Sequence, residues 1–234
     1  MKIAVFADIH GNIYAFEKVV AALRRESCDL YCFAGDICGY YYYQNDIIDI
    51  MRGMTGLLCV AGNHDDAFLN ILKASRIEKS YADRYGASSS LLKKTITDGN
   101  IEYLKAMPNK RIIKNEGIGM FHGSPWNCLN GYVYPTDEVD RFAPLHYRFI
   151  ILGHTHYPMV RKIENVCIVN PGSCGQPRDY NMPSYAVIDT KTGEISIKRV
   201  SYDHRKMVKD VMDRKEKYQY LVEVLKRGRD DRVS

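Results

Sequence analysis

The chain has 234 residues, of which 46% are hydrophobic and 26% charged, and its formal net charge is +5. These proportions are ordinary for one large globular domain and exclude a fibrous or disordered chain. No apolar run approaches the roughly twenty residues that cross a bilayer, so we expect no membrane partner.

The positive charge is concentrated near the end of the sequence. Residues 205–234 hold ten Lys/Arg against six Asp/Glu, which gives 10 − 6 = +4 of the net charge. The rest of the chain is close to neutral, so a nucleic-acid partner is not expected. Seven cysteines without a CxxC pair, and a first apolar run too short for a signal peptide, favour a cytoplasmic protein.

Short apolar runs at 3–7, 30–34 and 57–61 alternate with segments of helical period, the clearest of which follows Asn12 as a candidate N-cap. This order predicts a parallel sheet covered by helices. From about residue 67 to 110 the sequence is polar and mainly helical, and we interpret it as an insertion over the sheet edge.

A second set of short strands is predicted after residue 147, in FIILG, MVRKI, VCIVNPG, SYAVID and EISIKRV. We expect these strands to form a largely antiparallel second sheet, which gives an α/β domain over residues 1–203. Residues 204–234 are predicted as a basic C-terminal helical tail. We interpret its basic residues as the solvent-exposed face of the helix. As alternatives, they form a contact between copies in a homo-oligomer or attract an anion.

Polar side chains follow the apolar runs at five places. The motifs ADIHGN, AGDICGY, AGNHDD, MFHGSP and LGHTHYP supply Asp8, His10, Asp36, Asn63, His64, His122, His154 and His156. Strand ends of open α/β sheets form ligand sites, so these groups should converge. Residues i and i+2 of an extended segment project together, so His154 and His156 should point to one place. Each motif alone is more simply a turn or a core histidine, but five together indicate a metal site.

This ordered series resembles the calcineurin-like metallophosphoesterase superfamily, over residues 1 to about 189. The resemblance implies a four-layer αββα sandwich of two mixed β-sheets, with two metal ions at one edge. It implies one ion bound by Asp8, His10 and His156, a second bound by Asn63, His122 and His154, and Asp36 as the bridge between them. It also implies that His64 is the catalytic residue that contacts phosphate or protonates the leaving group, with Asp65 orienting it. These ligands suit Mn best, with Fe or Zn as alternatives.

The second motif reads GDICGYY where the family's protein phosphatases have GDxxDRG, so an acid and an arginine are missing. The chain is more similar to the small bacterial and archaeal phosphodiesterase branch, which shares a segment like NPGSCGQPRD. In that segment Arg178 is a candidate clamp for phosphate, or a plain surface arginine. Tyr40 is a candidate for stacking on a nucleobase, or it packs against the inserted helices.

The resemblance therefore implies a hydrolase, a dinuclear metal-dependent phosphodiesterase that cleaves a nucleotide-type or small phosphodiester with a metal-bridging hydroxide. A phosphomonoesterase and a dinucleoside polyphosphate hydrolase share the same core and remain alternatives. A different class is a non-catalytic binding scaffold similar to the retromer subunit Vps29. Since His64 and every expected ligand are present, the enzyme is favoured over the scaffold.

Overall fold

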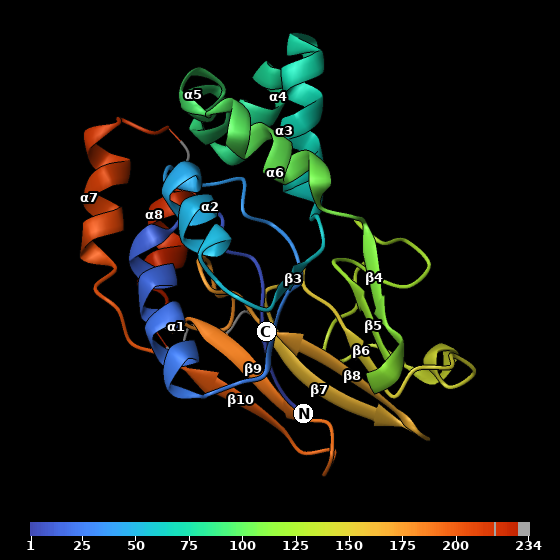
Figure 1. Cartoon of the computed structure of the whole chain (residues 1–234). Helices are drawn as coiled ribbons and strands as arrows, with labels where there is room; N and C mark the ends of the chain where they lie inside the picture. The colour runs from blue at the N-terminus through green and yellow to red at the C-terminus, as the bar shows by residue number, and fades with distance from the viewer. Residues whose placement is uncertain (218, 229–234) are drawn as a thin grey trace.

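Two five-stranded sheets packed face to face form the centre of the computed structural model, which describes residues 1–217 and 219–228 (Figure 1). The first sheet has the order β10-β9-β1-β2-β3. Its strands are β1 (Lys2–Phe6), β2 (Leu30–Phe33), β3 (Leu57–Cys59), β9 (Ser184–Asp189) and β10 (Ile195–Arg199). Strands β1, β2 and β3 are parallel, as predicted, whereas β9 runs antiparallel to β1 and to β10.

The second sheet has the order β4-β5-β6-β8-β7. Its strands are β4 (Lys110–Ile113), β5 (Ile118–Phe121), β6 (Phe149–Ile151), β7 (Pro158–Ile163) and β8 (Val166–Pro171). Its three central strands are parallel and its two edge strands antiparallel. The expectation that all late strands share one sheet is wrong, because β9 and β10 join β1. The alternation of apolar residues shows that a strand is buried, but not which sheet it joins.

Helices cover the outer face of the first sheet and rise above its edge (Figure 1). They are α1 (Ile13–Arg25), α2 (Gln44–Arg52), α3 (Asn63–Lys73), α4 (Glu78–Tyr85), α5 (Ser88–Thr95), α6 (Asp98–Ala106), α7 (Arg205–Asp213) and α8 (Tyr220–Glu223). Helix α1 begins as expected, because the side-chain oxygen of Asn12 accepts the backbone N–H of Ala15. In the described part of the chain, no helix is long and apolar enough to span a membrane.

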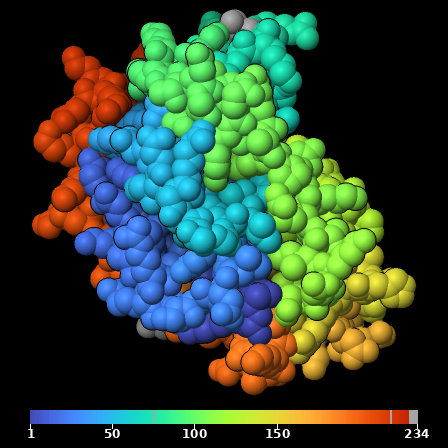
Figure 2. Space-filling model, in the orientation of Figure 1, coloured from blue at the N-terminus to red at the C-terminus, as the bar shows by residue number. Residues whose placement is uncertain are grey.

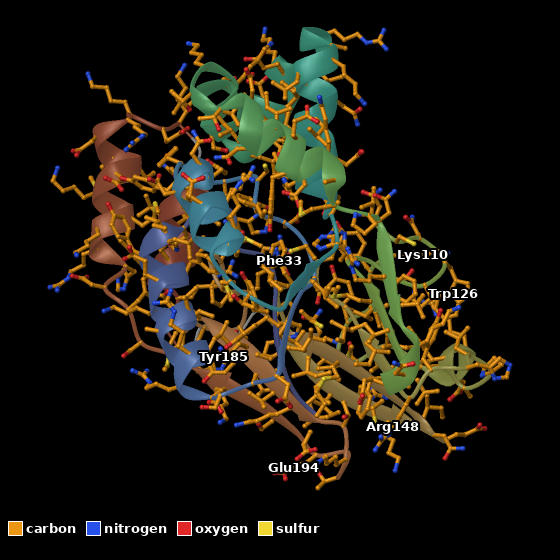
Figure 3. The ribbon with its side chains drawn as sticks, in the orientation of Figure 1. Phe33, Lys110, Trp126, Arg148, Tyr185 and Glu194 are labelled. Carbon is orange, nitrogen blue, oxygen red and sulfur yellow. The ribbon has the colours of Figure 1, made fainter. Side chains whose placement is uncertain are left out.

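The core has three apolar layers. One lies between the sheets and contains Ile3, Val5, Ile118 and Phe149. A second lies between the first sheet and its helices, where Phe33 is fully buried (Figure 3). The third covers the outer face of the second sheet through residues 123–148, an irregular segment that contains Trp126 and a short 3-10 helix, η3 (Asp140–Phe142). These layers confirm the predicted α/β sandwich of two mixed sheets.

The C-terminal segment packs against the N-terminal part of the chain (Figure 2). It forms α7, α8 and the short 3-10 helix η4 (Val224–Lys226), and its last residues, 229–234, lie outside the described part. Its buried side chains contact Tyr40 and Tyr41, and they are Met207, Val211, Leu221, Val224 and Leu225. The boundary at residue 203 stays a prediction, but much of this segment is core and not a solvated face.

Candidate metal centre

The polar residues predicted from the sequence meet where the central strands end. Asp8 and Asp36 follow β1 and β2, Asn63 begins α3, and His122 follows β5 directly. Potential ligand atoms lie within 4.8 Å of one another in three overlapping groups, Asp8–His10–His156, His10–Asp36–His64 and Asp36–His122–His154. The two predicted sets of metal ligands therefore lie side by side. The middle group, which contains both His10 and Asp36, connects the other two.

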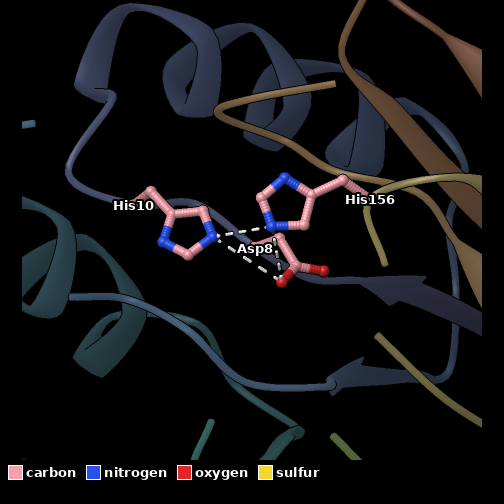
Figure 4. Close-up of side chains that lie close together, drawn as sticks. All are labelled: Asp8, His10 and His156. Atoms are coloured by element: carbon pink, nitrogen blue, oxygen red, sulfur yellow. Dashed lines mark hydrogen bonds and ion pairs between the residues drawn. The ribbon is translucent and has the colours of Figure 1, made fainter. Parts of the chain in front are cut away.

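The first group is a tight triangle of acceptor atoms (Figure 4). The Nε2 atoms of His10 and His156 are 3.0 Å apart, and Asp8 Oδ1 lies 3.7 and 3.4 Å from them. Each Nδ1 bonds to a backbone carbonyl, of Cys38 at 2.8 Å and of Gln176 at 2.7 Å. A carbonyl only accepts, so each Nδ1 carries the proton and each Nε2 presents a lone pair. Two facing lone pairs repel each other, and a cation between them removes that repulsion.

The second group surrounds His122, whose Nδ1 donates to the carbonyl of Ala34 at 2.7 Å. Its Nε2 lies 2.9 Å from Asn63 Oδ1 and 3.2 Å from Asp36 Oδ2. Among the described residues, the buried atoms Asp36 Oδ2 and His154 Nε2 have no hydrogen-bond partner. Each such atom costs about 1–3 kcal/mol when left unsatisfied, and a metal ion would satisfy both. The donor set therefore fits a metal ion here too.

The backbone around the cluster is strained. Nine non-glycine residues of the described chain have a positive φ, and six of them lie in this region: Asp8, His10, Asp36, Tyr40, His154 and His156. A left-handed conformation costs about 1–2 kcal/mol per residue, so its concentration here is typical of a functional site. The expectation that strand alternation points His154 and His156 to one place is wrong. Both lie in left-handed turns beyond β6, and they join different groups.

The loops that carry the cluster are held together by Asp65. Its carboxylate accepts four backbone N–H groups at 2.9–3.0 Å, those of Asp36, Ile37, Cys38 and Gly62. The expected role of Asp65 in orienting His64 is therefore wrong. Instead, Nδ1 of His64 shares a short hydrogen bond with the hydroxyl of Tyr81 on α4, and the His64 backbone N–H donates to Asp36 Oδ1 at 2.9 Å.

Burial keeps most of these imidazoles neutral. It lowers the pKa of His64 and of His154 to about 3, and it lowers the pKa of His156 well below its ordinary value. Burial also acts to lower the pKa of His122, but the carboxylate of Asp36 outweighs it and raises that pKa to about 9. Neutral imidazole is the form that binds metals, and a cation beside Asp36 would release the proton of His122.

The cluster opens into a cavity of about 390 Å³. Arg178 lines this cavity, and its Nη2 is 3.5 Å from the hydroxyl of Tyr40. The Tyr40 ring is only 4% exposed and packs edge-on against His10, with ring centroids 4.7 Å apart. Arg178 thus contributes to the wall of the cavity, whereas Tyr40 offers little free surface for stacking.

Several cavity residues could not be found by motif. They come from α4, from the 123–148 segment and from the C-terminal segment, and they are Arg84, Tyr85, Tyr132, Tyr220 and Arg227. None of them follows a strand of the central sheets, and none belongs to a recognisable pattern in the sequence. Tyr132 is 51% exposed, and its ring centroid lies 4.1 Å from that of His154.

Residues 1–193 match the family model of the calcineurin-like phosphoesterase superfamily domain. The chain belongs to this superfamily, so the family predicted from the motifs is confirmed, and with it a metal-dependent phosphoester hydrolase fold. The chain is 31% identical over 232 residues to an uncharacterized protein of Methanocaldococcus jannaschii, and the match covers 90% of this chain and 91% of the relative.

Solved structures from a bacterium and an archaeon have the same fold. A metallophosphoesterase from Sphaerobacter thermophilus has a TM-score of 0.79 and 25% sequence identity, covering 96% of this chain and 98% of its own. A hypothetical protein from Pyrococcus horikoshii has a TM-score of 0.80 and 20% identity, covering 97% and 98%. Each match therefore covers nearly the whole chain.

Proposed function

We propose that the protein is a dinuclear metal-dependent phosphodiesterase that acts on a nucleotide-type or small phosphodiester. The position of Asp36 carries this proposal. Its Oδ2 faces both ligand groups, at 3.8 Å from His10 Nε2 and 3.2 Å from His122 Nε2. A carboxylate between two sets of imidazoles is the arrangement that lets two cations share one ligand.

The residues around Asp36 would hold the two ions. Asp8, His10 and His156 would bind one, and Asn63, His122 and His154 would bind the other. Manganese suits this mixture of imidazole, carboxylate and amide ligands best, with iron or zinc as alternatives. When bound, such a pair of ions lowers the pKa of water and neutralises charge on the phosphoryl oxygens.

His64 is the proposed catalytic residue. The Tyr81 hydroxyl fixes Nδ1, which leaves Nε2 as the nitrogen available to a phosphate oxygen or to the departing alkoxide. His64 lines the same cavity as Arg178, whose guanidinium can make two parallel hydrogen bonds to a phosphate. These two side chains would orient the scissile group and stabilise charge that develops on it.

An aromatic surface supports a nucleotide-type substrate. Tyr132 is half exposed and stacks on Tyr134, with ring centroids 5.7 Å apart and an angle of 7° between the rings. If the phosphate lies at the metal centre, a planar group attached to it that extends past His154 would reach this surface. Stacking on it would contribute about 1–3 kcal/mol. The half-exposed ring of Tyr132 therefore replaces Tyr40 as the proposed base contact.

A cytoplasmic location is part of the same proposal. All seven cysteines are unbonded, which supports a reducing compartment. A scaffold that only binds a partner is not favoured, because His64 lines the cavity together with four of the seven proposed ligands, Asp36, Asn63, His154 and His156.

The experiment is hydrolysis by chelator-treated protein after addition of Mn, Fe, Zn or Mg. The substrates are bis-p-nitrophenyl phosphate, p-nitrophenyl phosphate, cyclic nucleotides and a dinucleoside tetraphosphate. We expect Mn to restore cleavage of the diesters, and we expect Asp36→Asn and His64→Ala to reduce it by about 10²–10⁴-fold. The control is Arg205→Gln, at a surface arginine paired with Asp203.

No turnover by folded, metal-bound protein would contradict the proposal. Faster cleavage of p-nitrophenyl phosphate than of the diester would replace it by a phosphomonoesterase.

A further inference from the structure

Three arginines line the cavity beyond the metal centre. Arg84 lies near the end of α4, Arg178 lies between β8 and β9, and Arg227 follows η4. They come from three distant parts of the sequence, so their meeting is a property of the fold and not of one basic segment.

None of these three guanidinium groups forms an ion pair with a carboxylate of residues 1–217 or 219–228. Other arginines do, in the pairs Arg199–Asp179, Arg205–Asp203 and Arg214–Asp210. The cavity therefore gathers positive charge that the described chain leaves uncompensated.

Neutral groups hold the arginines in place. Arg84 and Arg227 lie over the rings of Tyr85 and Tyr220, with Cζ 5.1 and 5.6 Å from the centroids. Arg227 Nη1 also donates to the backbone carbonyl of Arg178 at 3.1 Å. Aromatic rings and carbonyls position a guanidinium without cancelling its charge, so the N–H groups remain available to an anion.

Among the described residues that line the cavity, Asp36, the proposed bridge between the metal ions, is the only one with a carboxylate. A simple phosphodiester carries one negative charge, which Arg178 and the metal centre already offset. Arg84, which is exposed, and Arg227, which is half-buried, also line the cavity and would then face no anion. The cavity thus has more positive charge than a simple diester requires.

Building on the proposed function, we infer that the substrate carries a second anionic group, a further phosphate on a nucleotide, which Arg84 and Arg227 bind. Arg178 faces the phosphate that is cleaved. Because Arg84 belongs to the inserted helices and Arg227 to the C-terminal segment, these two parts of the chain select the substrate.

The test is isothermal titration calorimetry with Mn-loaded protein. The probes are thymidine 5′-phosphate, thymidine 3′,5′-bisphosphate and a thymidine 5′-diphosphate analogue with a methylene bridge, which resists cleavage. The last two place a second phosphate at different distances. We expect at least one of them to bind about tenfold or more tightly than thymidine 5′-phosphate, through charge-assisted hydrogen bonds.

The variant is the double substitution Arg84→Gln and Arg227→Gln, which should reduce that advantage to about threefold or less. The matched control is Arg205→Gln with Arg214→Gln, which removes the same charge from arginines that already have carboxylate partners. The control should keep the full advantage, whereas loss of affinity through net charge alone would lower it equally in both variants.

Equal affinity for all three probes, or an advantage that survives Arg84→Gln with Arg227→Gln, would overturn the inference. Because the readout is binding, it is independent of turnover. An arginine-dependent advantage without hydrolysis of any diester would reject the proposed function alone, and hydrolysis without the advantage would reject only the second anion site.

Discussion

The metal cluster and the outer wall of the cavity are built by different parts of the molecule. The cluster comes from turns directly after the central strands, held by the four backbone contacts of Asp65. The wall comes from α4, from residues 123–148 and from the C-terminal segment, held by aromatic and apolar packing. The difference separates the residues that we propose for the chemistry, which the sheets hold in place, from those that we propose for choosing the substrate, which peripheral segments supply.

The largest expected effect concerns the cluster. If metal ions relieve the facing lone pairs of His10 and His156, Mn at about 1,000 times its dissociation constant should raise the free energy of unfolding by about 4 kcal/mol. Urea unfolding of chelator-treated protein, with and without Mn, measures this change. Asp36→Asn should lose most of the gain, whereas Arg205→Gln should keep it. Equal stability with and without metal would show that the cluster is satisfied without ions.

The next effect concerns the wall. Leu221 is fully buried against Tyr41, whose hydroxyl donates to the Leu221 carbonyl at 3.0 Å. Leu221→Ala should lower the free energy of unfolding by about 3 kcal/mol if the C-terminal segment is part of the cooperative core. The control is Met212→Ala on α7, at a side chain that is 66% exposed, with an expected change within about 0.5 kcal/mol.

The Leu221→Ala result also sharpens the comparison of the two regions. A small loss of global stability, together with faster proteolysis of the C-terminal segment, would mean that the wall opens without unfolding the sheets. The metal cluster would then be rigid and the wall movable, and the boundary predicted at residue 203 would mark a real unit.

The cluster could be predicted from the sequence because each of its residues lies next to an apolar strand. The GD motif illustrates this. Gly35 has a φ of +97°, and a Cβ at this position would lie 2.7 Å from His122 Nδ1. Glycine is therefore required directly before Asp36, and the motif reflects how closely the loop packs against His122. What the sequence could not give was the conformation of these turns. A positive φ is uncommon in any residue other than glycine. The left-handed backbone at His154 and His156 could therefore not be predicted from their residue type.

The wall could not be predicted, because Arg84 and Arg227 are separated by most of the domain and belong to segments with no motif. Their charge was visible, but ordinary surface arginines have the same sequence pattern, as Arg205 and Arg214 demonstrate. Only the packing of the C-terminal segment on Tyr40 and Tyr41 shows that Arg227 lies at the cavity. Long-range contacts of this kind carry no local periodicity.

A smaller effect joins the two regions. Tyr81, on α4 in the wall, bonds to Nδ1 of His64 in the cluster. As a positioning residue, Tyr81→Phe should reduce kcat for bis-p-nitrophenyl phosphate by about tenfold with little change in KM, since the bond orients a group needed only for the chemical step. Steady-state kinetics measure this split, with thermal unfolding as the check on folding. A rise in KM with unchanged kcat would assign Tyr81 to the cavity wall alone.

The smallest effect lies at Glu26, which belongs neither to the metal cluster nor to the cavity lining, and it gives a baseline for both regions. Lys198 donates to both carboxylate oxygens of Glu26, at 2.7 and 2.8 Å, and the Tyr185 hydroxyl donates to one of them at 2.9 Å. The hydrogen bonds from Lys198 are the main reason why the pKa of Glu26 is lowered from 4.5. A group with a lowered pKa stabilises the fold at a pH above its unfolded-state pKa, and this effect is lost as the pH falls through its folded-state pKa.

Because Lys198 is 41% exposed, we expect Glu26→Gln to cost about 0.5 kcal/mol at pH 7 and nothing well below pH 4.5. Urea unfolding of both proteins across this pH range measures the difference, and a difference that persists in acid would assign the effect to packing instead of charge.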